Sequence, residues 1–395
     1  MLTESLKGYN YSPQLGRDLK ALFLIKSFNQ QAMFRSAMER IRKGGPHKDI
    51  VGITRVRDCH DGVAFVAGLD TEQLDLSQAE WQYKTREATG ASFHGAKLVL
   101  ASGDMVEVID NSSRNRILYH YPWFGHMHTV SFSSDGQRVL LASSGFDTIF
   151  EIDINDGHII WEWNGWENGY AQSGLGQYLT RTREVSERWS AEGKSVLFVD
   201  NPLKYAPFGI PTGLRACHLN GAAYGEENVI LSTFFHQGLA VAINKITGKP
   251  TEIAQGMVSV HGFLPDRNYG FIITDTGQGK FVILDRQFKP KRIITFSELP
   301  LPDPHLPLGE WLQYVTNIHG TLYAAIDIRR RCLFLFDAEK RTYRQIGIQP
   351  EWALQMVLSA PEGFPFTDPS GFQTIKKEIS KIPLVFQKPK YEQRH

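Results

Sequence analysis

Residues 138–153, RVLLASSGFDTIFEID, decide the fold of this chain, because their pattern predicts a buried strand, a tight turn and a second strand that ends in an acidic residue. Strands rich in Val, Ile and Phe and bounded by Gly, Asp or Asn are typical of β structure. The same unit recurs at residues 97–110, 229–244, 270–285 and 322–337, with a weaker copy from residue 63. One such unit cannot bury both of its faces, so units of this kind stack around a ring. The sequence therefore predicts an all-β protein, a six-bladed β-propeller, with seven blades as the alternative.

The repeats also divide the chain into regions. Residues 1–47 show apolar residues at helical spacing from Arg17 to Arg42, which predicts a short N-terminal helical extension. The propeller is expected over residues 48–360, with an insertion near 166–217 that forms either a lid loop or an irregular blade. Residues 361–395 are rich in Pro, Lys and Gln and are expected to wrap the outside.

The overall composition excludes several classes of function. The net charge is +1, so no global field attracts nucleic acid or an anionic membrane. No apolar stretch approaches the ~18 residues of a spanning helix, and no signal peptide is recognisable, which predicts a cytoplasmic protein. The three cysteines have no metal-binding spacing. We expect a small-molecule substrate, no nucleic-acid or membrane partner, and leave the oligomeric state open.

Histidines recur with the repeats. Six of them stand near the start of a repeat: His60, His94, His128, His218, His261 and His319. Because the first strand of each propeller blade lines the central channel, a residue repeated at its start would face its own copies. Clustered neutral imidazoles suit iron, copper or zinc. We therefore expect a metal centre on these six residues, with iron favoured, although histidines that only bond a neighbouring loop remain the structural alternative.

Two further histidines belong to this hypothesis. His126 lies two residues before His128, on the same face of a strand. His236 lies in a turn from which its ring could reach the mouth of the channel.

Residues 128–163 resemble a blade of the bacterial arylsulfotransferase propellers. So do His218-Leu219-Asn220 with the strands that follow them, and His261 with residues 274–277. The resemblance covers about residues 120–290 and implies a six-bladed ring in which a channel histidine carries the sulfuryl group. It makes His128, His218 and His261 candidates for the nucleophile or for stabilising the transition state, and Arg215 a possible oxyanion partner.

A second, looser resemblance favours iron. The carotenoid-cleaving oxygenases hold iron with four axial histidines in a propeller, and only this axial geometry is shared.

Three functions follow from these observations. The first is an enzyme whose axial metal activates water or dioxygen on a small organic substrate. The second is metal-free transfer of a group through a channel histidine. The third is a non-catalytic interaction scaffold, whose axis would be filled by small or apolar side chains rather than imidazoles.

Overall fold

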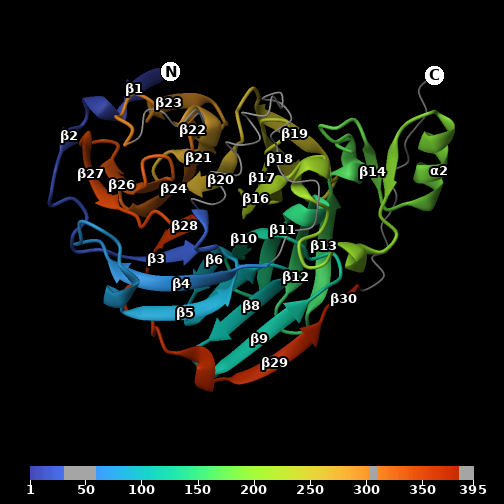
Figure 1. Ribbon diagram of the computed structural model, residues 1–395, viewed down its shortest axis with the longest axis horizontal. Coiled ribbons are helices and arrows are strands. Elements are labelled where there is room, and N and C mark those ends of the chain that lie inside the picture. The colour runs from blue at the N-terminus through green and yellow to red at the C-terminus, as the bar shows by residue number, and fades with distance from the viewer. Residues whose placement is uncertain (31–58, 303–309, 382–395) are drawn as a thin grey trace.

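The computed structural model describes residues 1–30, 59–302 and 310–381. It is built almost entirely of strands, which form six antiparallel blades in a propeller arrangement (Figure 1). The predicted all-β six-bladed fold is thus confirmed. Among the described residues, no helix is both long and apolar enough to cross a membrane.

Each blade is an antiparallel meander of four strands. From the innermost strand outward, blade 1 contains β28 (Leu354–Ser359), β3 (Lys20–Ile25), β4 (Asp61–Gly68) and β5 (Trp81–Arg86). In the same order, blade 2 contains β6 (Ala88–His94), β7 (Lys97–Ser102), β8 (Met105–Asp110) and β9 (Asn115–His120). Blade 3 contains β10 (Met127–Phe132), β11 (Arg138–Ser143), β12 (Thr148–Asp153) and β13 (His158–Asn164).

The second half of the ring repeats this plan. Blade 4 contains β16 (Leu219–Tyr224), β17 (Val229–Phe234), β18 (Leu239–Asn244) and β19 (Pro250–Ala254). Blade 5 contains β20 (His261–Asp266), β21 (Gly270–Asp275), β22 (Lys280–Asp285) and β23 (Pro290–Thr295). Blade 6 contains β24 (Leu312–His319), β25 (Leu322–Asp327), β26 (Cys332–Asp337) and β27 (Thr342–Gly347).

The turns within a blade follow the chemistry of the repeat. At the end of β12, the side chain of Asp153 accepts a hydrogen bond from the backbone N–H of Asn155, at 2.7 Å. Gly157 closes the turn with φ 77°, a conformation that a residue without Cβ adopts freely. The apolar side chains of these strands pack between neighbouring blades in separate buried clusters.

Both ends of the chain close and brace the ring. In blade 1 the innermost strand β28 comes from the C-terminal part and pairs with β3 from the N-terminal part. Four short strands add a parallel fifth strand to the outer edge of four blades. These are β1 (Leu2–Ser5) on blade 5, β2 (Asn10–Tyr11) on blade 6, β29 (Gln373–Glu378) on blade 2 and β30 (Ser380–Lys381) on blade 3. Figure 1 shows β29 running along β9.

The predicted helical extension is wrong for residues 1–30. This part of the chain holds strands β1, β2 and β3, and β3 belongs to blade 1, so the propeller begins well before residue 48. The apolar run Ala21-Leu22-Phe23-Leu24-Ile25 is buried on both faces of the blade. A short continuous apolar run fits a buried strand as well as a helix, which explains the error. Residues 31–47 lie outside the described residues.

Between β13 and β16 the chain leaves the ring. This segment contains β14 (Tyr178–Thr180), helix α2 (Arg183–Ala191) and β15 (Val196–Phe198), where β14 pairs with β15 and, through Tyr178, with Gln172 of the same segment. Figure 1 shows β14 and α2 at the right edge of the view, outside the six blades. The segment is therefore an insertion and not a seventh blade.

Candidate functional site

The register of the blades aligns one position at the start of every innermost strand. Met127 in β10 and Leu219 in β16 each lie opposite the last residue of the second strand of their blade. The residues that follow them, His128 and Asn220, are therefore equivalent. The same alignment across all six blades gives Thr89, His128, Asn220, His261, Gln313 and Gln355. All six are polar and buried.

The position two residues earlier also repeats, and it carries an unusual backbone. Glu87, His126, His218 and Ser259 stand there in blades 2 to 5, with φ between 45° and 54°. Residues other than glycine adopt this left-handed region only when their surroundings hold them in it. The turn places both this residue and the residue two positions later at the same end of the axis, where the innermost strands begin. We call this end of the axis the histidine end, and the opposite end the far end.

Five imidazoles meet at the histidine end. The ring centres of His126 and His128 are 5.4 Å apart, and that of His218 lies 6.0 Å and 6.1 Å from them. His261 from blade 5 lies 5.8 Å from His128 of blade 3. His236, on the hairpin between β17 and β18, lies 5.3 Å from His218. Because these rings come from three different blades, the cluster lies on the axis of the ring.

Two basic side chains hold the ring of His126 from opposite sides. Arg215 Nη1 lies 2.9 Å from Nδ1, and Lys26 Nζ lies 3.0 Å from Nε2. A guanidinium can only donate, so Nδ1 accepts a hydrogen bond from Arg215, and the proton of the neutral ring is then on Nε2, which faces Lys26 Nζ. Arg215 is fully buried and also donates to the carbonyl oxygens of Ile210 and Phe208, at 2.8 Å and 3.2 Å. The end of the insertion thus places a permanent positive charge beside the histidine cluster.

The tautomer of His261 follows from its partners. Its Nδ1 lies 2.9 Å from the carbonyl oxygen of Ser259 and 2.8 Å from Thr276 Oγ1. A carbonyl oxygen only accepts, so Nδ1 carries the proton. Nε2 then accepts from the amide nitrogen of Asn220, at 3.1 Å.

Burial keeps three of the rings uncharged at neutral pH. Loss of solvent lowers the pKa of His218 well below its usual range, and the Arg215 charge and the neighbouring histidines lower it further. Burial likewise lowers the pKa of His236 to about 4, again with help from Arg215. Burial lowers the pKa of His261 to about 4. Neutral imidazoles are the form that attacks an electrophile or binds a metal.

Several buried polar atoms of the cluster have no hydrogen-bond partner among the described residues. They are His218 Nδ1, His236 Nε2 and Asn220 Oδ1. An unsatisfied buried polar atom costs ~1–3 kcal/mol, so these three atoms are groups with which a bound molecule, water included, can form hydrogen bonds.

Aromatic rings flank the cluster. Phe235 lies 4.8 Å from His218 and 5.6 Å from His261, measured between ring centres. Trp311 from blade 6 lies 6.4 Å from His261, and Phe208 from the insertion lies 6.3 Å from His126. These rings offer flat apolar surfaces next to the basic and imidazole groups.

The structure brings together only half of the six histidines predicted to form one ring. His128, His218 and His261 belong to the cluster. His94 and His319 are the last residues of β6 and β24, so they lie at the far end, and His319 is exposed. His60 precedes β4, the third strand of blade 1, where its Nε2 lies 3.3 Å from Asn29 Nδ2.

The error has a physical cause. Even spacing along the chain does not give equal position within a blade, because blade 1 receives its innermost strand from the C-terminal part and the blades differ in loop length. His126 and His236, expected near the cluster, are part of it. The sequence did not indicate Lys26, because its segment was predicted to be helical.

Three of the imidazoles could hold a metal ion. One nitrogen of each of His126, His128 and His218 lies within 4.8 Å of the others. However, both ring nitrogens of His126 face basic groups, so a metal there would have to displace Arg215 or Lys26. Histidines that bind metals usually donate to carboxylates or carbonyls instead.

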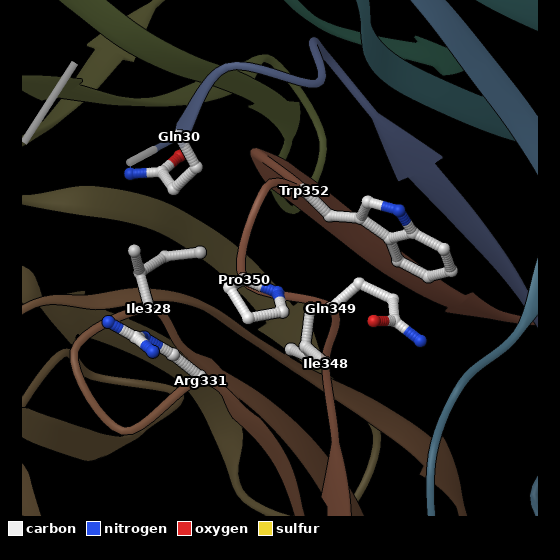
Figure 2. Close-up of a pocket in the computed structure, with 7 residues that line it drawn as sticks. All are labelled: Gln30, Ile328, Arg331, Ile348, Gln349, Pro350 and Trp352. Carbon is white, nitrogen blue, oxygen red and sulfur yellow. The ribbon is translucent and has the colours of Figure 1, made fainter. Parts of the chain in front are cut away.

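A separate small pocket lies on the loops of blades 6 and 1. Figure 2 shows Arg331, Pro350 and Trp352 around it, with Gln30 from the segment after β3. Its volume of about 20 Å³ is enough for one water molecule. It is too small for an organic substrate.

The fold and cluster define a class: a six-bladed propeller with buried imidazoles on its axis. Comparison with protein-family models gives no match, and comparison with curated proteins gives none either. Among solved structures, a protein of unknown function from Bacteroides caccae is similar, with a TM-score of 0.51 and 10% identity over 87% of this chain and 100% of that one. Virginiamycin B lyase from Staphylococcus aureus gives a TM-score of 0.44 with 10% identity over 84% of this chain and 89% of that one. At such identities the likeness concerns the fold alone.

Proposed function

We propose that this protein is an enzyme that transfers an anionic group, in the first instance a sulfuryl group, from an aryl ester to a hydroxyl acceptor through an axial histidine. The observation that carries this proposal is the pair of basic side chains, Arg215 and Lys26, set against uncharged imidazoles. Positive charge beside neutral nitrogen nucleophiles suits an anionic substrate better than a metal cation.

His218 is the proposed nucleophile. Its Nδ1 is buried without a partner among the described residues, and its lowered pKa leaves the nitrogen lone pair available at neutral pH. In the first step the lone pair attacks sulfur, the bond between sulfur and the aryl oxygen breaks, and the electron pair leaves with that oxygen. In the second step the acceptor oxygen attacks sulfur, the nitrogen–sulfur bond breaks, and the lone pair returns to His218.

The neighbouring groups have distinct roles in this scheme. The positive charges of Arg215 and Lys26 stabilise the anionic group as it moves. A neutral imidazole such as His236 or His261 takes the proton that the acceptor hydroxyl releases, because its low pKa keeps it unprotonated beforehand. Phe235 and Trp311 provide surfaces for the aryl ring.

The test is incubation of the purified full-length protein with 4-nitrophenyl sulfate and a phenol acceptor. The proposal expects release of 4-nitrophenolate that depends on the acceptor, and a sulfuryl adduct on a peptide containing His218 when the acceptor is omitted. The matched control is His319→Gln, which should behave as wild type. Absence of both transfer and adduct with aryl sulfates and aryl phosphates would rule the proposal out.

A metal centre is the second candidate, and the nitrogen triad of His126, His128 and His218 favours it. Iron is the metal proposed first, with copper or zinc as alternatives. The test is elemental analysis after reconstitution with each metal. Stoichiometric metal that is lost in His128→Gln and required for activity would establish this candidate. Substoichiometric metal in a folded wild-type protein would exclude it.

A further inference from the structure

Asp147 is a buried carboxylate on the hairpin between β11 and β12, and its backbone is left-handed, with φ 48°. Its Oδ2 accepts hydrogen bonds from the backbone N–H groups of Ala216 and Cys217, at 2.9 Å and 3.0 Å. The same oxygen accepts from Trp166 Nε1, at 2.9 Å. Its Oδ1 accepts from the backbone N–H of His218, at 2.7 Å. One side chain therefore binds four donors.

The four donors come from the two ends of the insertion. Trp166 stands where the chain leaves blade 3, and residues 216–218 stand where it enters blade 4. A carboxylate that accepts backbone N–H groups forms charge-assisted bonds, which are about twice as strong as neutral ones. Asp147 thus binds both ends of the insertion at one point beside the axis.

The bond to His218 has a further effect. His218 holds a left-handed backbone with φ 51°, a conformation that a residue with a Cβ keeps only when its surroundings hold it there. This conformation aims the side chain at the other imidazoles, and the carboxylate oxygen 2.7 Å from its N–H holds it there. Without that oxygen we expect the backbone of His218 to leave the left-handed conformation, which moves the ring away from the other imidazoles.

We propose that Asp147 is a positioning residue that sets the place of the His218 ring on the axis, acting through the backbone of residues 216–218. The inference rests on the proposed function only in its prediction of kcat for sulfuryl transfer. The claim about the ring can be tested without any substrate.

The molecule contains a matched comparison. Asp327 is also a buried carboxylate on the hairpin between the second and third strands of its blade. It accepts from the backbone N–H of Arg330 at 2.8 Å and from Arg330 Nη1 at 2.7 Å, so these bonds hold its own hairpin and not a histidine. Asp327→Asn therefore removes a comparable buried charge without touching the segment that carries His218.

The experiment compares Asp147→Asn with Asp327→Asn in full-length protein labelled with ¹⁵N in its histidine side chains. The His218 signals are assigned by their loss in His218→Gln. Asp147→Asn should shift them, since the ring leaves its buried place, and should lower kcat for sulfuryl transfer by ~10–100-fold, the range known for partners that orient metal-binding histidines. Asp327→Asn should leave both the signals and kcat as in wild type.

Each outcome decides the inference. Wild-type His218 signals in a folded Asp147→Asn protein would overturn it, and so would an equal shift in Asp327→Asn. A shift confined to Asp147→Asn in a protein that transfers no group would support the positioning role while the proposed function fails. If Asp147→Asn does not fold, Trp166→Phe decides instead. It removes one of the four donors and should shift the same signals less, and unshifted signals would overturn the inference.

Discussion

The two ends of the propeller axis carry the same residue type in different states. At the histidine end, His126, His128, His218 and His261 are between 4% and 7% exposed and touch one another. At the far end, His319 is exposed, and His94 packs its ring 5.9 Å from that of Phe132. Position within the blade, and not spacing along the chain, decides what a histidine does.

The histidine end is also the end that other segments can reach. Innermost strands begin there, second strands end there, and the connections between blades return there. Lys26 follows β3, a second strand, and Arg215 ends the insertion that connects blades 3 and 4. In blades 2 to 6 the far end receives the hairpins that leave the innermost strands and those that join the third and fourth strands, and in blade 1 the chain enters β3 and leaves β28 there. The connections at the histidine end therefore supply Lys26 and Arg215, the basic partners of the cluster.

The largest expected effect separates the two ends by activity. His218→Gln and His261→Gln should each lower kcat/KM for sulfuryl transfer by ~10²–10⁴-fold, because they remove the proposed nucleophile and a proposed proton acceptor. His128→Gln should also lower kcat/KM, because its ring packs between those of His218 and His261. His94→Gln and His319→Gln should stay near the wild-type value. Steady-state kinetics measures the difference, with near-ultraviolet circular dichroism as the check on folding. Equal losses at both ends would contradict an axial site at the histidine end.

A second comparison concerns two buried arginines. Arg215 and Arg344 are both fully buried and both donate to backbone carbonyl oxygens. Arg215 also contacts a ring of the cluster, at His126, whereas Arg344 binds the carbonyl oxygen of Leu69, away from the cluster. Replacing either by methionine leaves buried carbonyls without donors, which should lower the free energy of unfolding by ~2–4 kcal/mol.

The two substitutions should differ in activity. Arg215→Met removes the charge beside His126 and should lower kcat/KM by ~10–100-fold beyond any effect of stability. Arg344→Met should leave kcat/KM of the folded fraction unchanged. Chemical denaturation and kinetics at a temperature where both variants are folded make the comparison. An Arg344→Met protein as inactive as Arg215→Met would show that Arg215 acts through stability alone.

Much of the fold could be predicted from the sequence, because each blade repeats a strand, turn and strand with its own turn residues. The run from Arg138 to Asp153 forms β11 and β12 as expected. The helix predicted from Arg17 failed because β3 is buried on both faces, so its apolar run lacks the alternation that marks a strand. The closing strand β28 could not be assigned to blade 1 from local pattern, since its partner β3 lies at the other end of the chain.

The site could be predicted only in part. His128 and His261 occupy the repeated position at the start of an innermost strand, whereas His218 lies just before β16, two residues ahead of that position. The contact between Lys26 and His126 joins segments 100 residues apart, and nothing in either segment signals it. The resemblance implies that Arg215 is an oxyanion partner, and in the structure its side chain contacts His126 and two carbonyl oxygens. Long-range contacts of this kind depend on how the blades close, which local sequence does not encode.

The smallest expected effect is on how the free energy of unfolding depends on pH. It distinguishes the contribution of a buried, uncharged imidazole at the histidine end from that of a side chain that only packs. The pKa of His236 is lowered to about 4 in the folded protein, against ~6.5 for an unfolded histidine. As pH falls through 6.5 the unfolded chain takes up a proton that the folded protein does not, so the free energy of unfolding falls until pH approaches 4. Between pH 7 and 4.5 this one residue should account for ~2 kcal/mol of the loss.

The free energy of unfolding of His236→Gln should therefore fall over this range by that much less than that of wild type. Phe235→Leu, in the same turn, should lower the free energy of unfolding by an amount that does not change with pH. Urea denaturation at a series of pH values measures both variants. A His236→Gln protein whose stability falls with acid as steeply as wild type would mean that the ring is accessible to protons, and that burial is not what keeps the cluster uncharged.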